Sequence, residues 1–282
     1  MPDVLKRVPV GWERWQSRAL VWIVGALLVV AAVAPVVLDF HGWRGLRALA
    51  LPFLLSAAFA LVVWGLRAAT WAAAVMGFFV CFILAGRPVV WPEFGERPVF
   101  HPAIAALVAV FVLAYAATKF GRVKKEARGL GEGRRGRRAS QIVANLGVAA
   151  LAAAMGSYIG CIAALAEAAA DTVSSEIGQA VGGPVWLVTT WRRVPPGTDG
   201  GVSFVGTIAG CVAALVIAGF GGLHHALWPH GWVVFVAACA GLGFDSLLGA
   251  TVERRGWVGN DWVNFASTLF AAVVAGVLAR MV

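Results

Sequence analysis

Long apolar runs, separated by short polar segments, follow one another along most of the chain. Runs of about 17–22 apolar residues are long enough to cross the hydrocarbon core of a bilayer as helices. We expect such helices near residues 19–38, 48–66, 69–86, 102–118, 141–158, 161–181, 202–221, 231–249 and 262–280. The pattern therefore predicts an all-α fold, a polytopic integral membrane helix bundle with about nine transmembrane helices.

The composition agrees with this class of protein. Hydrophobic residues make up 60% of the chain and charged residues only 13%, whereas soluble domains carry about 25% charged residues. All four cysteines fall in apolar segments without the spacing of a metal site, so we expect packed, reduced thiols. The net charge of +9 does not indicate a nucleic-acid partner, because basic loops of membrane proteins set topology and contact lipid headgroups.

Basic residues fix the expected orientation. Most of the 23 Lys and Arg residues share one side of the bundle if the N-terminus is cytoplasmic, and cytoplasmic loops carry such an excess. We therefore expect a multi-pass protein of a bacterial-type inner or plasma membrane with a cytoplasmic active face. Residues 1–118, whose four spans contain no acidic residue, are interpreted as a helical scaffold, and residues 119–282 as the functional core.

Acidic residues inside two predicted spans are the first candidates for chemistry. Glu167, Asp171 and Glu176 lie in the sixth span, and Asp245 lies near the inner end of the eighth. Glu167 and Asp171 are four residues apart and share a helix face. Because buried carboxylates are costly in hydrocarbon and hard cations prefer oxygen ligands, the four residues are candidate Mg²⁺ ligands. Neutral carboxyl groups, or ion pairs with basic residues elsewhere, are the alternative.

Polar segments that we place on the cytoplasmic side supply candidate phosphate-binding residues. One is a basic, glycine-rich stretch of residues 119–145, another is the turn VPPGTDGGVSFVG of residues 194–206, and the last is residues 241–264. Glycine-rich turns at helix N-termini expose N–H groups to anions, and basic side chains neutralise phosphate charge. The candidates are Lys119, Lys124, Arg134, Arg138, Gln141, Asn145, Thr198, Asp199, Gly200, Gly201, Ser246, Asn260 and Asn264.

Three blocks in the second half resemble a known membrane family. AEAAADTVSSEIG, VPPGTDGGVSFVGT and GLGFDSLLGA, with QIVAN before them and Asn260 and Asn264 after them, are similar to the family of transmembrane protein 19 and plant phytyl-phosphate kinase. The resemblance covers about residues 119–280. It implies a CTP-using membrane transferase, distantly similar to dolichol kinase and CTP-dependent phosphatidate cytidylyltransferase. In that family the matching residues form an acidic signature, a glycine turn and a DS motif.

The leading hypothesis is a Mg²⁺-dependent prenyl-phosphate kinase. Asp171, Asp245 and Glu167 would serve in catalysis, CTP or another nucleoside triphosphate would donate the γ-phosphate, and an isoprenoid monophosphate would accept it. A cytidylyltransferase acting on a lipid phosphate would use the same groups. An ion-coupled transporter with Glu167 and Asp171 at mid-membrane is an alternative from another class. Small residues at 206–210 would permit a homodimer.

Overall fold

The computed structural model describes residues 10–38, 42–86, 102–130, 136–221 and 228–282. Within these ranges the structure is almost entirely helical. The helices are α1 (Val10–Leu38), α2 (Gly42–Gly65), α3 (Trp71–Gly86), α4 (Pro102–Lys119), α5 (Arg122–Ala127), α6 (Ala139–Ala154), α7 (Tyr158–Val181), α8 (Phe204–Gly221), α9 (Trp228–Leu248) and α10 (Asn260–Leu278). A π-helical turn, η1 (Gly249–Glu253), continues α9 directly.

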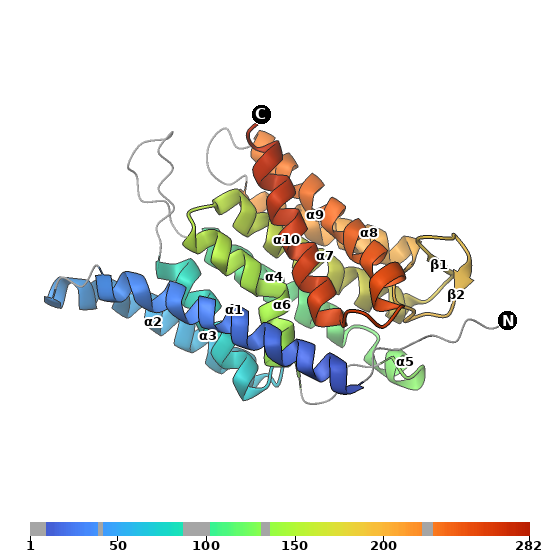
Figure 1. The fold of residues 1–282 in the computed structure, drawn as a ribbon, viewed down its shortest axis with the longest axis horizontal. Coiled ribbons are helices and arrows are strands. Elements are labelled where there is room, and N and C mark those ends of the chain that lie inside the picture. The colour runs from blue at the N-terminus through green and yellow to red at the C-terminus, as the bar shows by residue number, and fades with distance from the viewer. Residues whose placement is uncertain (1–9, 39–41, 87–101, 131–135, 222–227) are drawn as a thin grey trace.

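Helix α7 lies at the centre of the bundle. It packs against α4, α6, α8, α9 and α10, and Figure 1 shows α1–α3 on one side of it and α8–α10 on the other. Residues 160–170 of α7 are all buried. This stretch is rich in alanine, and small side chains let neighbouring helices approach closely. The sequence of α7 thus allows its acidic residues to be enclosed by other helices.

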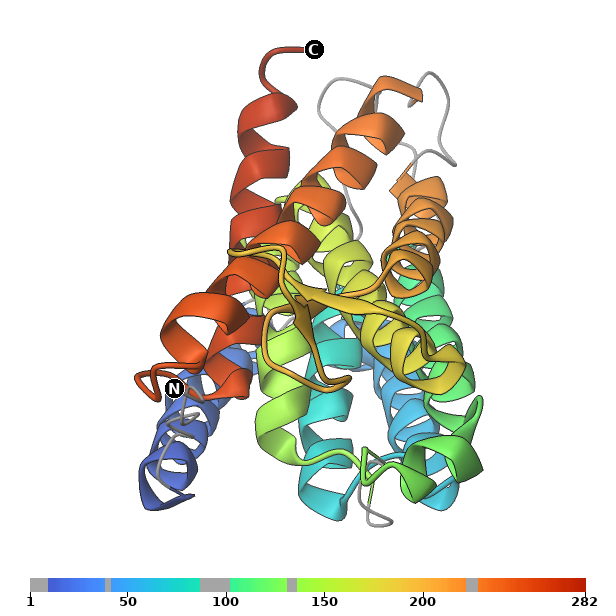
Figure 2. The same ribbon diagram turned by 90° about the vertical axis from the view of Figure 1, so that its right-hand side faces the viewer.

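A small antiparallel sheet lies at one end of the bundle. Its strands are β1 (Val185–Leu187), β2 (Arg193–Val194) and β3 (Gly201–Val202), in the order β2-β1-β3. The register pairs Trp186 with Arg193 on one side and with Val202 on the other. The sheet and α5 share the same end of the molecule in Figure 1, and Figure 2 views the molecule from that end. The polar segments after α4 and α7 therefore lie together.

At this end, the loop between α2 and α3 is hydrogen-bonded to the segment before α6, and this connects the N-terminal helices to the rest of the bundle. The N–H of Arg137 donates to the carbonyl of Ala68 at 2.9 Å, and the N–H of Thr70 donates to the carbonyl of Arg137 at 2.9 Å. Gly136 has φ +74°, and a Cβ there would lie 2.7 Å from the Arg67 carbonyl oxygen. Glycine is required because both the backbone conformation and the close approach exclude a side chain.

A buried glutamine on α1 provides a second connection. Gln16 is 6% exposed. Its Nε2 donates to the carbonyl of Trp257 at 2.8 Å, and its Oε1 accepts from the N–H of Gly259 at 2.7 Å. The carboxamide therefore satisfies both a carbonyl and an N–H of the loop before α10. One hydrophobic core includes Leu20 and Val24 of α1 together with alanines of α7.

The expected all-α architecture is confirmed. Each of the nine apolar segments largely coincides with one helix, although several helices begin before the predicted span. Helix α5 lies within the basic, glycine-rich stretch of residues 119–145, where no helix was expected before residue 141, and its Arg122 and Glu126 form an (i, i+4) ion pair of 2.8 Å. The fifth predicted span is too long, because α6 ends at Ala154 and a turn at Gly156, with φ +80°, precedes α7. The three strands were not predicted because strands of two or three residues leave no periodic pattern.

Three of the described helical segments are both long and apolar enough to cross a membrane. They are Gly11–Leu38, His230–Glu253 and Asn260–Leu278. Leu49–Gly65, Trp71–Gly86, Ala103–Lys119, Ala139–Ala154 and Phe204–Phe220 are shorter apolar helices. The number of crossings and the side on which the N-terminus lies stay predictions.

Candidate functional site

A polar cavity opens beside α7, next to the sheet, and measures about 1250 Å³ together with its opening to solvent. Its walls come from segments far apart in the sequence: α6, α7, the 196–203 turn, α8, α9 and the start of α10. Most of the candidates from the sequence line it, and these are Gln141, Asn145, Asp171, Glu176, Thr198, Asp199, Gly200, Gly201, Asp245, Ser246, Asn260 and Asn264. The fold thus places the acidic, glycine-turn and DS segments around one space.

The carboxylates of Asp171 and Asp245 reach the cavity from neighbouring helices. Asp171 projects from α7 and Asp245 from α9, and the two interact electrostatically. The Ser267 hydroxyl donates to Asp245 Oδ1 at 3.3 Å. Two acids on separate helices can face the same ligand without lying on one helix face. This arrangement suits a cation that is held between helices.

Glu167 lies deeper than the other two acids. It is 1% exposed and does not line the cavity, although it is within electrostatic range of Asp171 and Asp245. Its Oε1 has no hydrogen-bond partner among the described residues. A Cβ on Gly241 of α9 would lie 2.6 Å from Glu167 Cγ, so the glycine makes room for this side chain. A buried carboxylate oxygen without a donor is costly unless a cation is near.

Three helices begin at the polar cavity. Gln141 lies in the first turn of α6, Ser203 and Thr207 lie at the start of α8, and Asn260 is the first residue of α10. The Ser203 hydroxyl accepts from the N–H of Gly206 at 3.1 Å, as an N-cap residue does. Helix N-termini carry partial positive charge and favour anions. Three helix N-termini at one cavity would favour an anionic ligand there.

The glycine turn is held against the end of α9. Gly200 has φ +70°, and a Cβ there would lie 2.2 Å from the backbone nitrogen of Ala250 in η1. The turn is closed by the N–H of Gly201, which donates to the Thr198 carbonyl at 2.9 Å. Only a residue without a side chain permits this approach. Gly200 therefore determines how closely its neighbour Asp199 lies to the C-terminal end of α9.

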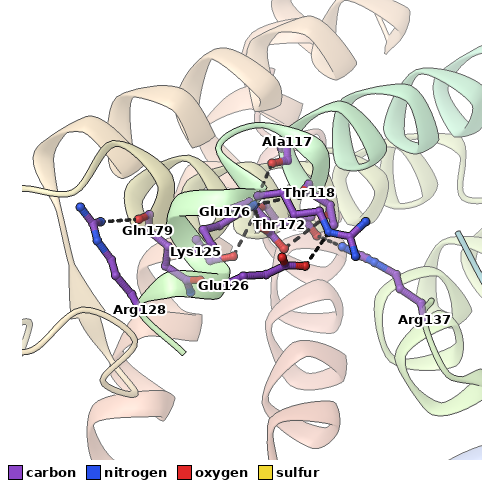
Figure 3. Close-up of polar contacts among 11 residues, drawn as sticks. Ala117, Thr118, Lys125, Glu126, Arg128, Arg137, Thr172, Glu176 and Gln179 are labelled. Atoms are coloured by element: carbon purple, nitrogen blue, oxygen red, sulfur yellow. Dashed lines mark hydrogen bonds and ion pairs between the residues drawn. The ribbon is translucent and has the colours of Figure 1, made fainter. Parts of the chain in front are cut away.

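Glu176 has a basic partner, Lys125 of α5, and Figure 3 shows their contact. Both side chains are buried, and the ammonium also donates to the carbonyls of Ala117 and Thr118 at 3.2 and 2.9 Å. The three donors of the lysine are thus all used. The alternative kept open for the acids, an ion pair with a basic residue elsewhere, is what the structure shows for Glu176. Its role as a metal ligand stays a prediction.

Arg137 is a site residue that the sequence did not single out. It contributes the only Lys or Arg side chain among the described residues that line the polar cavity. Its Nη2 donates to Thr172 Oγ1 at 3.3 Å, and Figure 3 shows it directed toward α7. It also interacts electrostatically with Asp171. In the run GRRGRR no pattern separates Arg137 from its neighbours, and the hydrogen bonds to the α2–α3 loop set its direction.

The basic residues chosen from the sequence lie elsewhere. Lys119 has its ammonium 5.1 Å from the centre of the Tyr115 ring and lines a different, apolar cavity. Lys124 and Arg138 are exposed and line neither cavity. Arg134 lies outside the described residues. Sequence reasoning also passed over Glu253 of η1, which interacts electrostatically with Asp171 and Asp199.

The donor set of the cavity fits Mg²⁺ bound together with phosphate. No group of three or more His, Cys, Asp or Glu side chains in the described part of the chain could hold a metal ion by itself. Mg²⁺ is usually held by one or two carboxylates together with substrate phosphates. Asp171 and Asp245 supply two carboxylates facing one space, and the unpartnered Oε1 of Glu167 adds buried negative charge nearby. The site therefore suits a cation that is bound together with phosphate groups.

The fold and this site define a polytopic membrane protein with a polar cavity among its helices. The chain belongs to the family described as "Integral membrane protein DUF92", whose model matches residues 54–272. The match includes every candidate site residue. It establishes the chain as an integral membrane protein of this family.

Relatives of the chain come from bacteria, plants and archaea. It is 33% identical over 201 residues to an uncharacterized membrane protein of Synechocystis sp., covering 66% of this chain and 76% of the relative. It is 32% identical to Protein VTE6, chloroplastic, of Arabidopsis thaliana, over 71% of this chain and 63% of that one. It is 33% identical to an uncharacterized membrane protein of Methanocaldococcus jannaschii, over 61% and 74%. No solved structure matches the chain.

Proposed function

We propose that this protein is a membrane-embedded prenyl-phosphate kinase, which transfers the γ-phosphate of CTP or another nucleoside triphosphate to an isoprenoid monophosphate. The observation that carries the proposal is the polar cavity, where Asp171 and Asp245 face three helix N-termini and a glycine turn. Acids for a cation and N–H donors for phosphates are what phosphoryl transfer requires. The resemblance to the phytyl-phosphate kinase family supports the same assignment.

The charge of the cavity supports a requirement for a divalent cation. Among the described residues, the carboxylates of Asp171, Glu176, Asp199 and Asp245 line it, against the single guanidinium of Arg137. Lys125 neutralises only one of these acids. A nucleoside triphosphate alone would be repelled by this surface. When bound, Mg²⁺ would neutralise charge on the phosphates, and Asp171 and Asp245 are the residues that would hold it.

Residues of the chain position both the nucleoside triphosphate and the phosphate of the acceptor lipid. The N-termini of α6, α8 and α10 and the 198–201 turn bind the triphosphate, and Arg137 holds the acceptor phosphate against it. An oxygen of the lipid monophosphate attacks the γ-phosphorus, the bond from that phosphorus to the β–γ bridging oxygen breaks, and the nucleoside diphosphate leaves with the electron pair. Because the acceptor phosphate is already ionised near neutral pH, no general base is required.

The direct test uses purified protein in detergent with Mg²⁺, γ-labelled CTP or ATP, and a short prenyl monophosphate. The expected result is label in a prenyl diphosphate, with unlabelled nucleoside diphosphate as the other product. Label found only in pyrophosphate, together with a CDP-lipid, would replace this proposal with cytidylyl transfer. A folded protein that turns over neither nucleotide with any prenyl phosphate, but carries out ion-coupled uptake in proteoliposomes, would make it a transporter.

We also propose that the site faces the cytoplasm, where nucleoside triphosphates are available. The excess of Lys and Arg at the end of the bundle that carries α5 and the sheet supports this orientation. Cysteine accessibility in sealed right-side-out vesicles tests it: a cysteine at exposed Lys124 should react only after the vesicles are opened. Labelling in intact vesicles would reverse the orientation.

A further inference from the structure

A second cavity lies on the other side of α7, among the N-terminal helices, and measures about 1190 Å³ together with its opening to solvent. Apolar residues of α2, α3 and α4 form much of its lining, among them Phe59, Val63, Leu107, Val110 and Phe111. Sites that bind small molecules are lined mostly by apolar groups. The lining of this cavity is therefore suited to a hydrocarbon chain.

Cations occupy one end of the apolar cavity. Arg67 follows α2, Lys119 ends α4, Arg122 and Lys125 belong to α5, and Arg137 precedes α6. All five come from helix ends, loops or the short helix α5, and two of them are paired with acids, Arg122 with Glu126 and Lys125 with Glu176. The cavity is therefore amphipathic along its length. Its chemistry matches a molecule with one apolar tail and an anionic head, because the tail avoids water and the head meets positive charge.

The apolar and polar cavities meet at three shared residues. Arg137, Asn145 and Thr172 line both of them. The hydrogen bond from Arg137 Nη2 to Thr172 Oγ1 lies at this junction, and the residue before Thr172 on α7 is Asp171. A head group at the cationic end of the apolar cavity would thus lie beside the acids of the polar cavity.

We propose that the apolar cavity is the binding site for the isoprenoid tail of a prenyl monophosphate, with Arg137 binding its phosphate where the two cavities meet. This proposal rests on the proposed function for the identity of the head group. It gives α2, α3 and α4 a direct part in selecting the lipid, beyond the scaffold role expected from the sequence. Chain length would be limited by the apolar residues farthest from Arg137.

The test is photo-crosslinking without nucleotide, so that it does not depend on turnover. The probe is a prenyl monophosphate with a diazirine at the end of its tail, added to the full-length protein in detergent and in nanodiscs. We expect saturable adducts on peptides of α2, α3 and α4 that contain the lining residues, and unlabelled prenyl monophosphate should compete for them. Adducts confined to lipid-facing surfaces, or unaffected by competitor, would overturn the proposal.

Matched phenylalanine substitutions separate the cavity from the outer surface. Ala114 of α4 lines the cavity and is half-buried, whereas Ala116 on the same helix is exposed and does not line it. On α2, Ala60 and Ala58 form an equivalent pair. Ala114→Phe and Ala60→Phe should raise the apparent Kd for the probe roughly tenfold or more, because they fill the space. Ala116→Phe and Ala58→Phe should leave it near the wild-type value.

The outcomes distinguish this inference from the proposed function. Saturable labelling inside the cavity without kinase activity would retain the tail site and reject the kinase. Kinase activity together with labelling outside the cavity would retain the kinase and reject the tail site. Kinase activity together with equal Kd values for all four alanine variants would also retain the kinase and reject the tail site. If Ala114→Phe fails to fold, Ala60→Phe decides the question, since the two lie on different helices.

Discussion

The ammonium of Lys125 and the carboxylate of Glu176 form an ion pair inside the protein, between α5 and α7. The same lysine donates to two carbonyls in the last turn of α4, so one side chain joins three helices. Breaking a buried pair leaves an uncompensated charge and costs more than the pair contributes. The contact therefore determines whether α5 stays in place beside the cationic end of the apolar cavity.

Removing only one member of this pair should destabilise the protein. We expect Glu176→Gln to lower the free energy of unfolding by about 3–5 kcal/mol, because Lys125 then remains buried and charged. Adding Lys125→Met should recover most of this loss. Thermal midpoints from intrinsic tryptophan fluorescence in detergent measure both effects. Single variants as stable as the wild type would contradict the prediction.

The same double variant examines Glu176 as a metal ligand. If Glu176 acts only through Lys125, the stable double variant should require the same Mg²⁺ concentration for half-maximal activity as the wild type. A stable double variant that needs much more Mg²⁺ would instead support the ligand role predicted from the sequence. Mg²⁺ titration of the kinase reaction separates the two roles.

The two cavity acids should be essential for transfer. Asp171→Asn and Asp245→Asn should each lower kcat by about 100-fold or more, since stabilising phosphoryl charge by a held cation is worth several kcal/mol. EDTA should abolish wild-type activity, and Mg²⁺ should restore it. Glu126→Gln is the matched control, because Glu126 is an exposed carboxylate on α5 that lines neither cavity. Full activity in either aspartate variant, with normal folding, would contradict the proposed site.

Substituting two adjacent arginines, one at a time, tests the prediction from the structure against the prediction from the sequence. Arg137 lines both cavities, and Arg138 is exposed and lines neither. We expect Arg137→Gln to raise the KM for prenyl monophosphate roughly 10-fold or more, because hydrogen bonds to charged groups contribute about 1.5–3 kcal/mol. Arg138→Gln should change KM by less than about twofold, as for surface positions away from a site. The reverse ranking would favour Arg138, the residue chosen from the sequence.

Arg137→Lys tests whether a positive charge at this position is sufficient to bind the prenyl monophosphate. Lysine keeps the charge but loses the planar, forked geometry that suits phosphate. We expect intermediate KM values for this variant, and a thermal midpoint near that of wild type, because the bonds from residue 137 to Ala68 and Thr70 are made by its backbone. Equal KM values for Arg137→Lys and wild type would mean that the guanidinium fork is not used.

Much of the fold could be predicted from the sequence, because hydropathy and spacing directly report burial in apolar surroundings. Asp171 and Asp245 were identifiable for the same reason, since a carboxylate within an apolar run is rare and conspicuous. The 198–201 turn was identifiable from its glycines. Their arrangement around one cavity follows from topology, because α7, α8 and α9 are consecutive helices that pack together.

Arg137 and Lys125 could not be predicted because their roles depend on contacts between distant segments. Both belong to a stretch where nearly every second residue is basic, and residue type does not reveal which side chain turns inward. The direction of Arg137 depends on hydrogen bonds to the α2–α3 loop, and that of Lys125 depends on Glu176, 51 residues away. The apolar cavity was equally hidden, since hydrophobic residues that face a cavity, a core or lipid look alike in sequence.

Gly200 offers a last prediction, on the geometry of the turn. Its φ of +70° excludes a side chain, and so does the distance of 2.2 Å that would separate a Cβ at this position from the Ala250 nitrogen. Gly200→Ala should therefore move the turn away from η1 and reduce kcat/KM for the nucleotide by at least about 10-fold, in line with strain of about 1–3 kcal/mol at such positions. Nucleotide binding and turnover are the measurements.

Gly129→Ala provides the control, because Gly129 has φ +72° but nothing within 4 Å of its Cβ position. Backbone strain without a clash should lower stability slightly and leave nucleotide KM unchanged. Equal losses in the two variants would show that contact between the turn and α9 does not shape the site.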